Sequence, residues 1–278
     1  MGEYLVIPDT LRSGVRQSHA NLWHRCPTQL WFYLYSGPMK PSIYRITGSA
    51  GHAAIEFDMI HRLETGESRK ISEVLDIFTS NYDAGLLTLD STEGVDPKRL
   101  RDRITGYGNE PGSLPLIIRQ TARLTPKLVE KPFSLDIEGI DVPIVGTIDF
   151  FASDGTLRDF KFRIGARTPT QNDIDRSFQL TTYQLGLVSL GEHVRTVGEF
   201  EILANPSKSA GVVEISAPPR SDRELEGALD EFTSIVRFVD LANGDPGLYP
   251  KTSPQNWWCG EKWCGWWNKC PRGGGKYE

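Results

Sequence analysis

The sequence predicts a mixed α/β or α+β fold with a helical N-terminal part, a central sheet and a cysteine-rich C-terminal tail. Three observations predict it. Apolar residues recur at helical spacing over most of residues 14–129, and strand-like alternation replaces that spacing across 133–163. Helix and strand patterns then follow one another as far as Asn243-Gly244. After Pro250 the chain becomes rich in Trp, Cys and Gly. Helices followed by a meandering sheet define a mixed domain.

The elements follow from the spacing of apolar residues and from the residues that break it. We expect helices over 14–35, 48–65, 71–88, 96–129, 174–190 and from 221 to 242. Pro27 is expected to start or break the first helix, and the Gly and Pro residues of 36–47 predict a loop. The 96–129 helix is expected to break at residues 106–108 and 111–112.

The sheet is expected to contain a hairpin and two later strands. The predicted strands are Val145 to Phe151, Thr156 to Arg163, about 196–204 and 211–216. Asp154-Gly155 is a hairpin turn signal between the first two. Ser221 and Glu224 form a capping box at the start of the last helix.

Length and composition set limits on the protein. The 278 residues suit one large or two small domains, and we expect one domain over residues 1–250 and a separate tail over 251–278. The net charge of −5 excludes a generally basic surface but allows a local basic groove. No apolar run is long enough for a membrane span, and the first residues do not resemble a secretory signal. A cytoplasmic location is therefore expected.

The predicted hairpin carries the first candidate site. Asp159 and Lys161 share one face of a strand, because side chains two residues apart point the same way, and Phe160 and Phe162 take the other face. Pairing through the turn brings Asp149 toward Asp159. Two carboxylates in contact repel unless a cation or a proton lies between them, and Mg²⁺ or Mn²⁺ prefers such oxygen ligands. A lysine beside them can orient a water molecule or stabilise charge on a phosphate.

Two helices add further polar groups. Gln179 and Tyr183 are four residues apart and therefore share a helix face, from which they can bind a phosphate or neighbouring catalytic groups. Upstream, Gly48-Ser49-Ala50-Gly51 precedes His52, whose imidazole at the head of a helix could ligate a metal. Glu56 lies one turn beyond His52 and is a weaker candidate.

The placement of the four cysteines is unusual. Cys26 stands alone, whereas Cys259, Cys264 and Cys270 lie within the last 20 residues. A disulfide framework is not expected in a reducing compartment, where clustered cysteines indicate metal or iron–sulfur ligands. Inert buried thiols are the alternative.

The ordered set of motifs resembles the PD-(D/E)XK nuclease superfamily, and within it the RecB-type branch. The residues that carry the resemblance are Gly48-x-x-x-His52, the Gly146-Thr147-Ile148-Asp149 strand, Asp159-x-Lys161 and Gln179-x-x-x-Tyr183. It implies a restriction-endonuclease-like core, a mixed sheet flanked by helices. Each motif alone is weakly specific, and their order and context make the resemblance strong.

The cysteines resemble those of the iron–sulfur RecB-like nucleases, which include the AddB type and the CRISPR-adaptation type. There a lone N-terminal cysteine and three C-terminal ones hold a 4Fe–4S cluster. Cys26-Pro27 matches the first position. The tail departs from the family pattern, since four residues rather than two separate Cys259 and Cys264. Four thiolates also suit zinc, so both centres remain open.

The resemblance implies a Mg²⁺- or Mn²⁺-dependent DNA exonuclease in recombination, repair or phage DNA processing. The expected metal ligands are His52, Asp149, Asp159 and the Phe160 carbonyl. Lys161 would position the attacking water or stabilise charge, and Gln179 and Tyr183 would fix the DNA backbone and the lysine. The expected partners are single-stranded DNA or DNA ends and a recombination or integration protein, and no membrane is expected.

Other interpretations stay open at this point. One is a CRISPR-adaptation nuclease that trims DNA ends, and another is a non-catalytic iron–sulfur protein that binds DNA ends. An iron–sulfur redox sensor is a third. The tail tryptophans are expected to pack around the metal centre or against the N-terminal helix rather than to stack on bases. Arg158, Arg163, Arg167 and Arg176 could form either a solvated face or a phosphate-binding rim.

Overall fold

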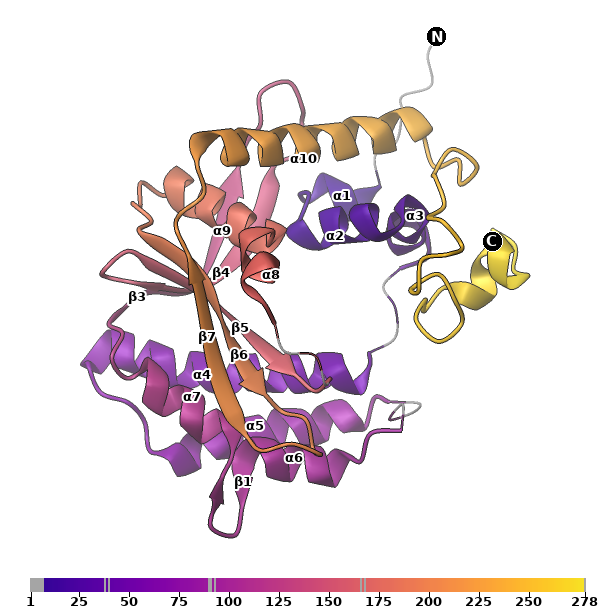
Figure 1. The fold of residues 1–278 in the computed structure, drawn as a ribbon. Coiled ribbons are helices and arrows are strands. Elements are labelled where there is room, and N and C mark those ends of the chain that lie inside the picture. Colours follow the sequence, from indigo (N-terminus) through magenta and orange to yellow (C-terminus); the bar gives the residue numbers. More distant parts are fainter. Residues whose placement is uncertain are drawn as a thin grey trace. The chain divides into compact units, whose positions relative to one another are not determined.

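The computed structural model describes residues 8–277 except 38, 40, 90, 91, 93, 166 and 168, and Figure 1 shows the chain. The described helices are α1 (Asp9–Arg12), α2 (Gln17–Arg25), α3 (Pro27–Ser36), α4 (Ile43–Thr65), α5 (Ile71–Leu86), α6 (Pro97–Thr105), α7 (Ser113–Thr121), α8 (Gln171–Asp175), α9 (Phe178–Ser189) and α10 (Asp222–Ala242). The strands are β1 (Gly106–Tyr107), β2 (Glu110–Pro111), β3 (Pro126–Leu135), β4 (Ile144–Ala152), β5 (Thr156–Arg163), β6 (Thr196–Leu203) and β7 (Gly211–Ala217). This mixture confirms the predicted α/β fold.

A five-stranded mixed sheet has the strand order β3-β4-β5-β6-β7. The turn at Asp154-Gly155 joins β4 to β5 as an antiparallel hairpin in which Phe150 pairs with Arg158. β6 runs parallel to β5, with Asp159 beside Glu199. Parallel neighbours need a crossover connection, and α8 and α9 supply it here.

The two faces of this sheet differ in character. Phe150, Phe160 and Phe200 lie on one face in the main hydrophobic core, where the rings of Phe160 and Phe200 stack 5.7 Å apart. Helices α4 and α7 cover this face, and α5 packs on α4. The opposite face carries Asp159 and Lys161, and α9 packs against it. Alternation along β5 therefore separates core residues from polar ones.

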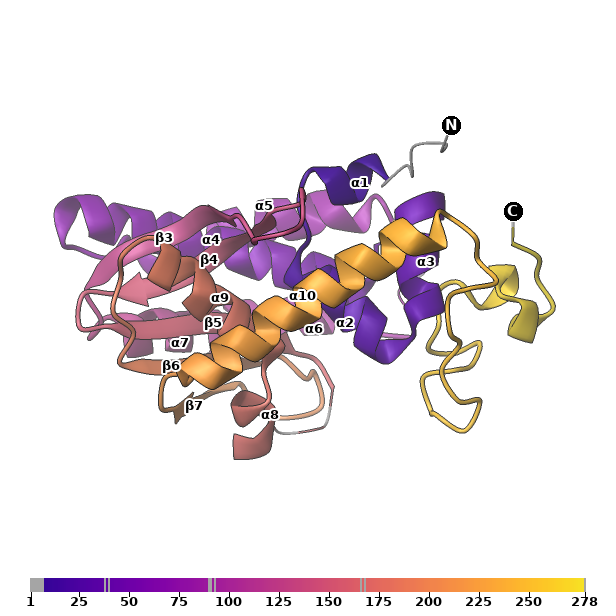
Figure 2. The ribbon, with the colours of Figure 1, turned by 90° about the horizontal axis from the view of Figure 1, so that it is seen from above.

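The chain forms two compact units. The first comprises Met1–Lys40, Ser134–Gly146 and Asp222–Glu278, and the second comprises Pro41–Phe133 and Thr147–Ser221. In the first unit α2 packs on α3 and on α10, and the tail after α10 consists of loops with two short 3₁₀ turns, Trp267–Lys269 and Pro271–Gly273 (Figure 2). The division at residue 250 stays a prediction from the sequence.

Three predicted boundaries differ from the structure. The predicted loop 36–47 is wrong at its end, because α4 begins at Ile43, where the Ser42 side chain caps the Arg45 amide. Residues 122–129 are not helical, since Pro126 starts β3 and disfavours helix at the residue before it. The predicted helix 174–190 is two helices, because Ser177 caps α9.

One further result concerns membranes. Within the described ranges, we find no helix whose length and hydropathy would let it cross a bilayer.

Candidate metal and catalytic site

Asp149 and Asp159 face each other across the β4–β5 hairpin. The pairing of Phe150 with Arg158 places Asp149 opposite Asp159 one step further along the ladder. Both carboxylates are buried, with exposed fractions of 7% and 0%. Burial, and then the charge of Asp159, raises the pKa of Asp149 well above its ordinary range. The pair therefore needs a proton or a cation to share the site.

Lys161 supplies positive charge at one side of this pair. Its Nζ lies 2.6 Å from Asp159 Oδ2 and donates a hydrogen bond to Gln179 Oε1 at 2.6 Å. Burial is the largest single influence and opposes the ammonium form, but the charge and hydrogen bond of Asp159, with the charges of Asp149 and Glu199, together raise the pKa of Lys161. The lysine is therefore held as a cation beside the carboxylates.

Helix α9 ties the two aspartates together. Gln179 Nε2 donates to Asp159 Oδ1 at 2.8 Å and to the Tyr183 hydroxyl at 2.7 Å. That hydroxyl donates to Asp149 Oδ1 at 3.2 Å. Burial, followed by the charges of the two aspartates, raises the pKa of Tyr183, so the phenol remains a donor. The i, i+4 spacing thus delivers both side chains to one network.

His52 approaches Asp149 from α4. Its Nδ1 lies 3.4 Å from Asp149 Oδ2. The imidazole does not stand at the head of a helix as predicted, because α4 begins nine residues earlier at Ile43. The close approach of α4 to β5 requires Gly51, where a Cβ atom would lie 2.0 Å from the Phe162 ring. Burial disfavours protonation, but a hydrogen bond to Glu130 and the nearby carboxylates raise the pKa of His52 to about 9.

Glu130 on β3 is a site residue that sequence reasoning missed. Its Oε1 lies 3.9 Å from His52 Nδ1. Ligand atoms of His52, Glu130 and Asp149 lie within 4.8 Å of one another. Glu130 has a φ of 43°, a left-handed conformation that is strained for a residue other than glycine and is typical of functional sites. The predicted helix 96–129 ended just before Glu130. Recognition of the strand that starts at Pro126 would have made its carboxylate a candidate ligand.

The residues fit a hard divalent cation. The nearby donors are carboxylate oxygens and one imidazole nitrogen, which suit Mg²⁺ or Mn²⁺. Asp159 Oδ2 is buried and has no hydrogen-bond partner, only the ionic contact with Lys161. Asp159 does not belong to the ligand group of His52, Glu130 and Asp149. Its oxygens are directed at Lys161 and Gln179 instead. The Phe160 amide donates to Asp149 Oδ2 at 3.4 Å, and the Phe160 ring lies in the core.

Glu199 on β6 is a second buried acid that the sequence did not reveal. It pairs with Asp159 in the parallel ladder, and Ser177 Oγ donates to its Oε1 at 3.3 Å. Burial, and then the charge of Asp159, raises the pKa of Glu199 to about 8. The acidic face of the sheet therefore continues onto β6.

The predicted arginine rim is not a single surface. Arg158 is buried and donates to Glu214 Oε1 at 3.0 Å and to Ser216 Oγ at 2.9 Å, so it can belong to neither a solvated face nor a phosphate rim. Arg163 pairs with Glu201, and Arg167 pairs with Asp173 at 2.6 Å.

All four cysteines line one pocket in the first unit. Amide, guanidinium and backbone N–H groups donate to three of the sulfur atoms: Gln29 to Cys264 at 3.3 Å, Thr252 to Cys26 at 3.4 Å and Arg272 to Cys259 at 3.5 Å. Burial raises the pKa of the Cys264 thiol, and the hydrogen bond from Gln29 opposes this. Among the cysteines, all of which are described, no three sulfur atoms lie within 4.8 Å of one another.

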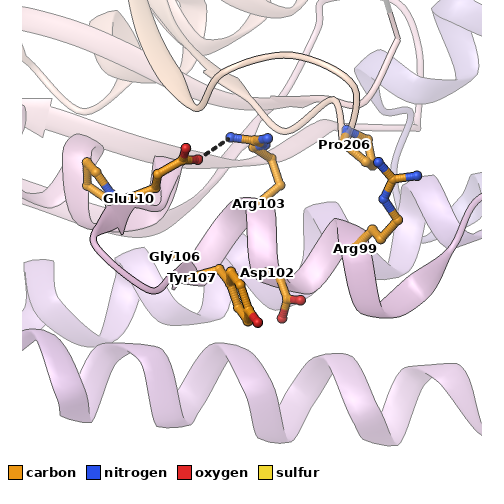
Figure 3. A pocket seen from close by; sticks show the side chains of 8 residues that line it. Arg99, Asp102, Arg103, Gly106, Tyr107, Glu110 and Pro206 are labelled. Carbon is orange, nitrogen blue, oxygen red and sulfur yellow. Dashed lines mark ion pairs between the residues drawn. The ribbon is translucent and has the colours of Figure 1, made fainter.

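Three adjoining pockets lie in the second unit. The pocket in Figure 3, of about 180 Å³, is lined by Arg99, Arg103 and Tyr107, and Arg103 Nη1 lies 3.7 Å from Glu110 Oε2. It shares Arg99 and Pro206 with a second pocket of about 280 Å³. The second shares Tyr44 and Ile164 with a third, of about 320 Å³, which also includes Phe162 and Arg163 at the end of β5. Because neighbouring pockets share lining residues, the three pockets form one continuous groove.

The fold places two carboxylates and a lysine on one sheet hairpin, next to a group of side chains that could hold a metal ion. The sequence matches the PD-(D/E)XK nuclease superfamily over residues 16–271, so the chain belongs to that superfamily. The predicted restriction-endonuclease-like core is thereby confirmed.

Solved structures are similar to this chain in fold. One is a Eubacterium rectale protein described as a "Putative exonuclease", with a TM-score of 0.54 and 12% identity over 90% of this chain and 88% of that one. Another is SSO0001, with a TM-score of 0.34 and 13% identity over 89% and 95% of the two chains, a similarity too low to argue from. No curated protein matches the chain.

Proposed function

We propose that this chain is a Mg²⁺- or Mn²⁺-dependent DNA exonuclease. The single observation that carries the proposal is the network in which Lys161, Gln179 and Tyr183 hold Asp149 and Asp159 on one buried sheet face. Membership of a nuclease superfamily supports phosphodiester hydrolysis. The exonuclease description of the Eubacterium rectale protein supports, by similarity of fold, attack at DNA ends.

The proposed roles follow from the contacts. His52, Glu130, Asp149 and Asp159 would hold the metal, with the Phe160 carbonyl beside them. A bound metal lowers the pKa of a water ligand and polarises the scissile phosphate. Lys161 holds Asp159 in place and presents a proton-bearing cation to developing negative charge. Gln179 fixes the Lys161 ammonium, and Tyr183 fixes Asp149.

The groove of three pockets is the proposed path of a DNA strand. Arginine side chains at both ends, Arg99 and Arg163, can contact phosphates, and Tyr44 and Tyr107 offer aromatic surface. This supports single-stranded DNA or DNA ends as the substrate.

One experiment tests the function. Linear single-stranded DNA labelled at the 5′ or the 3′ end and a circular single strand of equal length are incubated with Mg²⁺, with Mn²⁺ or with EDTA. We expect metal-dependent release of short products from the linear strands only. Cleavage of the circle would replace the exonuclease by an endonuclease, and full activity in EDTA would contradict a metal site.

We also propose that the four cysteines hold a 4Fe–4S cluster, with zinc as the alternative. The lack of any tight group of three sulfurs favours the cluster, since sulfurs around one zinc ion lie only about 3.8 Å apart. The small volume of the cysteine pocket, about 20 Å³, instead favours a single zinc ion. Iron, sulfide and zinc analysis of the purified protein distinguishes the two.

The biological setting follows from the resemblance alone. Recombination, repair or phage DNA processing is proposed, in the cytoplasm, with a recombination or integration protein as partner. The domain assignment is a nuclease domain over residues 1–250 and a tail over 251–278 that closes the metal centre with Cys26.

A further inference from the structure

Two of the five tail tryptophans lie on the surface. Trp257 and Trp263 are 65% and 49% exposed, although large aromatic side chains are usually mostly buried. The other three have structural contacts. Trp266 is buried and stacks on Phe32, Trp258 Nε1 donates to the Arg25 carbonyl at 3.0 Å, and Trp267 lines the cysteine pocket. The expectation that the tail tryptophans pack around the cysteines therefore leaves these two rings unexplained.

The exposed rings form a pair. Their centroids lie 5.2 Å apart with an interplanar angle of 89°. Trp257 also meets Trp258 edge-on, at 5.5 Å and 81°. In an edge-on pair the two ring faces are not stacked on each other, so a planar group can stack on a ring face that neither a neighbouring edge nor Lys262 covers.

Positive charge surrounds this pair. Residues 251–278 hold five lysines or arginines and two glutamates, a net charge of +3 in a protein whose net charge is −5. The Lys262 Nζ lies 4.8 Å from the centroid of the Trp263 ring. Arg25 Nη2 donates to the Trp263 carbonyl at 3.5 Å, and Arg25 is half-buried. Both cations therefore lie close to the exposed aromatic surface.

We propose that Trp257 and Trp263, with Lys262 and Arg25, form a stacking platform for the unpaired bases of single-stranded DNA. Aromatic rings give every base a π-face to stack on, and nearby cations pair with the phosphates. A purely apolar partner surface would not explain the local positive charge in an acidic protein. The identification of DNA as the ligand rests on the proposed nuclease function, whereas the inference that a planar group stacks on the two rings does not.

The test uses the full chain and a fluorescein-labelled 15-mer of deoxythymidine in EDTA, so that binding is measured without cleavage. We expect Trp257→Ala/Trp263→Ala to weaken binding by about fivefold or more for each ring lost. Trp257→Phe/Trp263→Phe, which keeps aromatic faces, should stay within about threefold of the wild type. Leu241→Ala, a change at an exposed apolar residue on α10, is the matched control and should bind as the wild type does.

A second readout covers the case in which the double alanine variant disturbs the tail. The intrinsic tryptophan fluorescence of the wild type should be quenched by the oligonucleotide, and Lys262→Ala/Arg25→Ala should weaken binding and reduce its salt dependence. Equal affinity of the wild type and the double alanine variant, without quenching, would overturn the platform. A change of oligomeric state in that variant with unchanged DNA affinity would assign the surface to a protein contact and also overturn it.

These outcomes are separable from those of the nuclease test. A wild type that binds the oligonucleotide through the two rings but cleaves no DNA with Mg²⁺ or Mn²⁺ would refute the proposed function and leave the platform standing. Metal-dependent cleavage by a protein whose DNA binding does not depend on the two rings would refute the platform and leave the proposed function standing.

Discussion

The Tyr183 hydroxyl on α9 donates a hydrogen bond to Asp149 on β4 at 3.2 Å, and this bond joins the helix to the metal-site strand. Tyr183→Phe keeps the ring and removes only this donor, so Asp149 loses a group that fixes its orientation. We expect cleavage to fall about tenfold, as one positioning hydrogen bond of about 1–1.5 kcal/mol would predict. Initial rates on end-labelled single-stranded DNA measure it.

Tyr82→Phe is the matched control. Tyr82 is also buried in the second unit, and its hydroxyl donates to the Pro97 carbonyl at 3.2 Å. This substitution should cost about 1 kcal/mol of unfolding free energy and leave the rate unchanged. A Tyr183→Phe rate equal to the wild type would show that the contact with Asp149 does not matter for the reaction.

Lys161→Ala and Asp159→Ala are expected to abolish cleavage. The first removes the cation within 2.6 Å of Asp159, and the second removes a carboxylate that faces Asp149. A loss of about a hundredfold or more is expected from the removal of a charge stabiliser. Both variants should remain folded by circular dichroism, because neither opens an apolar cavity.

Lys127→Ala controls for the loss of a lysine. Lys127 lies exposed on β3 and pairs with Glu192 at 2.5 Å, so this variant should cleave normally. Near wild-type turnover by Lys161→Ala or Asp159→Ala with metal present would refute the assigned site.

The sequence predicted those parts of the site that local geometry determines. A strand places Asp159 and Lys161 on one face, a short turn of residues 153–155 fixes Asp149 opposite Asp159, and helical spacing brings Gln179 beside Tyr183. None of these relationships depends on how distant segments meet.

The missed residues depend on long-range pairing. Glu199 reaches Asp159 only through the parallel register that the α8–α9 crossover sets, 40 residues later in the chain. Arg158 pairs with Glu214, 56 residues away, which a local pattern cannot predict. Glu130 adopts a left-handed conformation inside a strand, a choice that tertiary contacts impose against local preference.

Metal removal should stop the reaction. We expect activity with Mg²⁺ and Mn²⁺, little with Ca²⁺ because of its looser geometry, and none in EDTA. Glu130→Gln keeps the shape of the side chain but removes a charge near His52 and Asp149. The metal concentration for half-maximal cleavage should rise about tenfold or more.

Glu192→Gln is the control for the Glu130 substitution, since Glu192 is a carboxylate that pairs with Lys127 and belongs to no candidate ligand group among the described residues. It should leave the metal titration unchanged. An unchanged titration for Glu130→Gln would exclude Glu130 from the metal site.

The buried His19 should make the stability of the protein depend on pH. Its Nδ1 accepts a hydrogen bond from the Arg16 amide at 3.2 Å, and burial, followed by the charge of Arg16, lowers its pKa from 6.5 to about 4. The unfolded chain therefore takes up a proton first as the pH falls. His19 contributes fully to the free energy of unfolding above pH 6.5. This contribution is lost as the pH falls toward 4, which lowers the free energy of unfolding by up to about 3 kcal/mol.

Urea unfolding at pH 7, 6 and 5 measures this dependence. His19→Gln should flatten the pH dependence in this window, whereas His193→Gln, a change at an exposed histidine, should leave it as in the wild type. Equal slopes for the wild type and His19→Gln would show that His19 is not the group responsible.

The cysteine centre should tie the tail to the start of α3. Cys26 and Cys259 are more than 230 residues apart in sequence yet line the same pocket, and a metal that joins them adds its binding energy to folding. Closure of so long a loop adds further stabilisation. Cys26→Ser should therefore lower the melting temperature by more than about 5 °C, abolish any bound iron or zinc, and open the tail to proteolysis.

Ser253→Ala, an exposed change in the same tail, should do none of these. Cleavage in the cold should persist in Cys26→Ser, because the carboxylates and Lys161 lie in the other compact unit. A wild type without iron or zinc, together with an unchanged melting temperature for Cys26→Ser, would eliminate the metal centre and leave four free thiols.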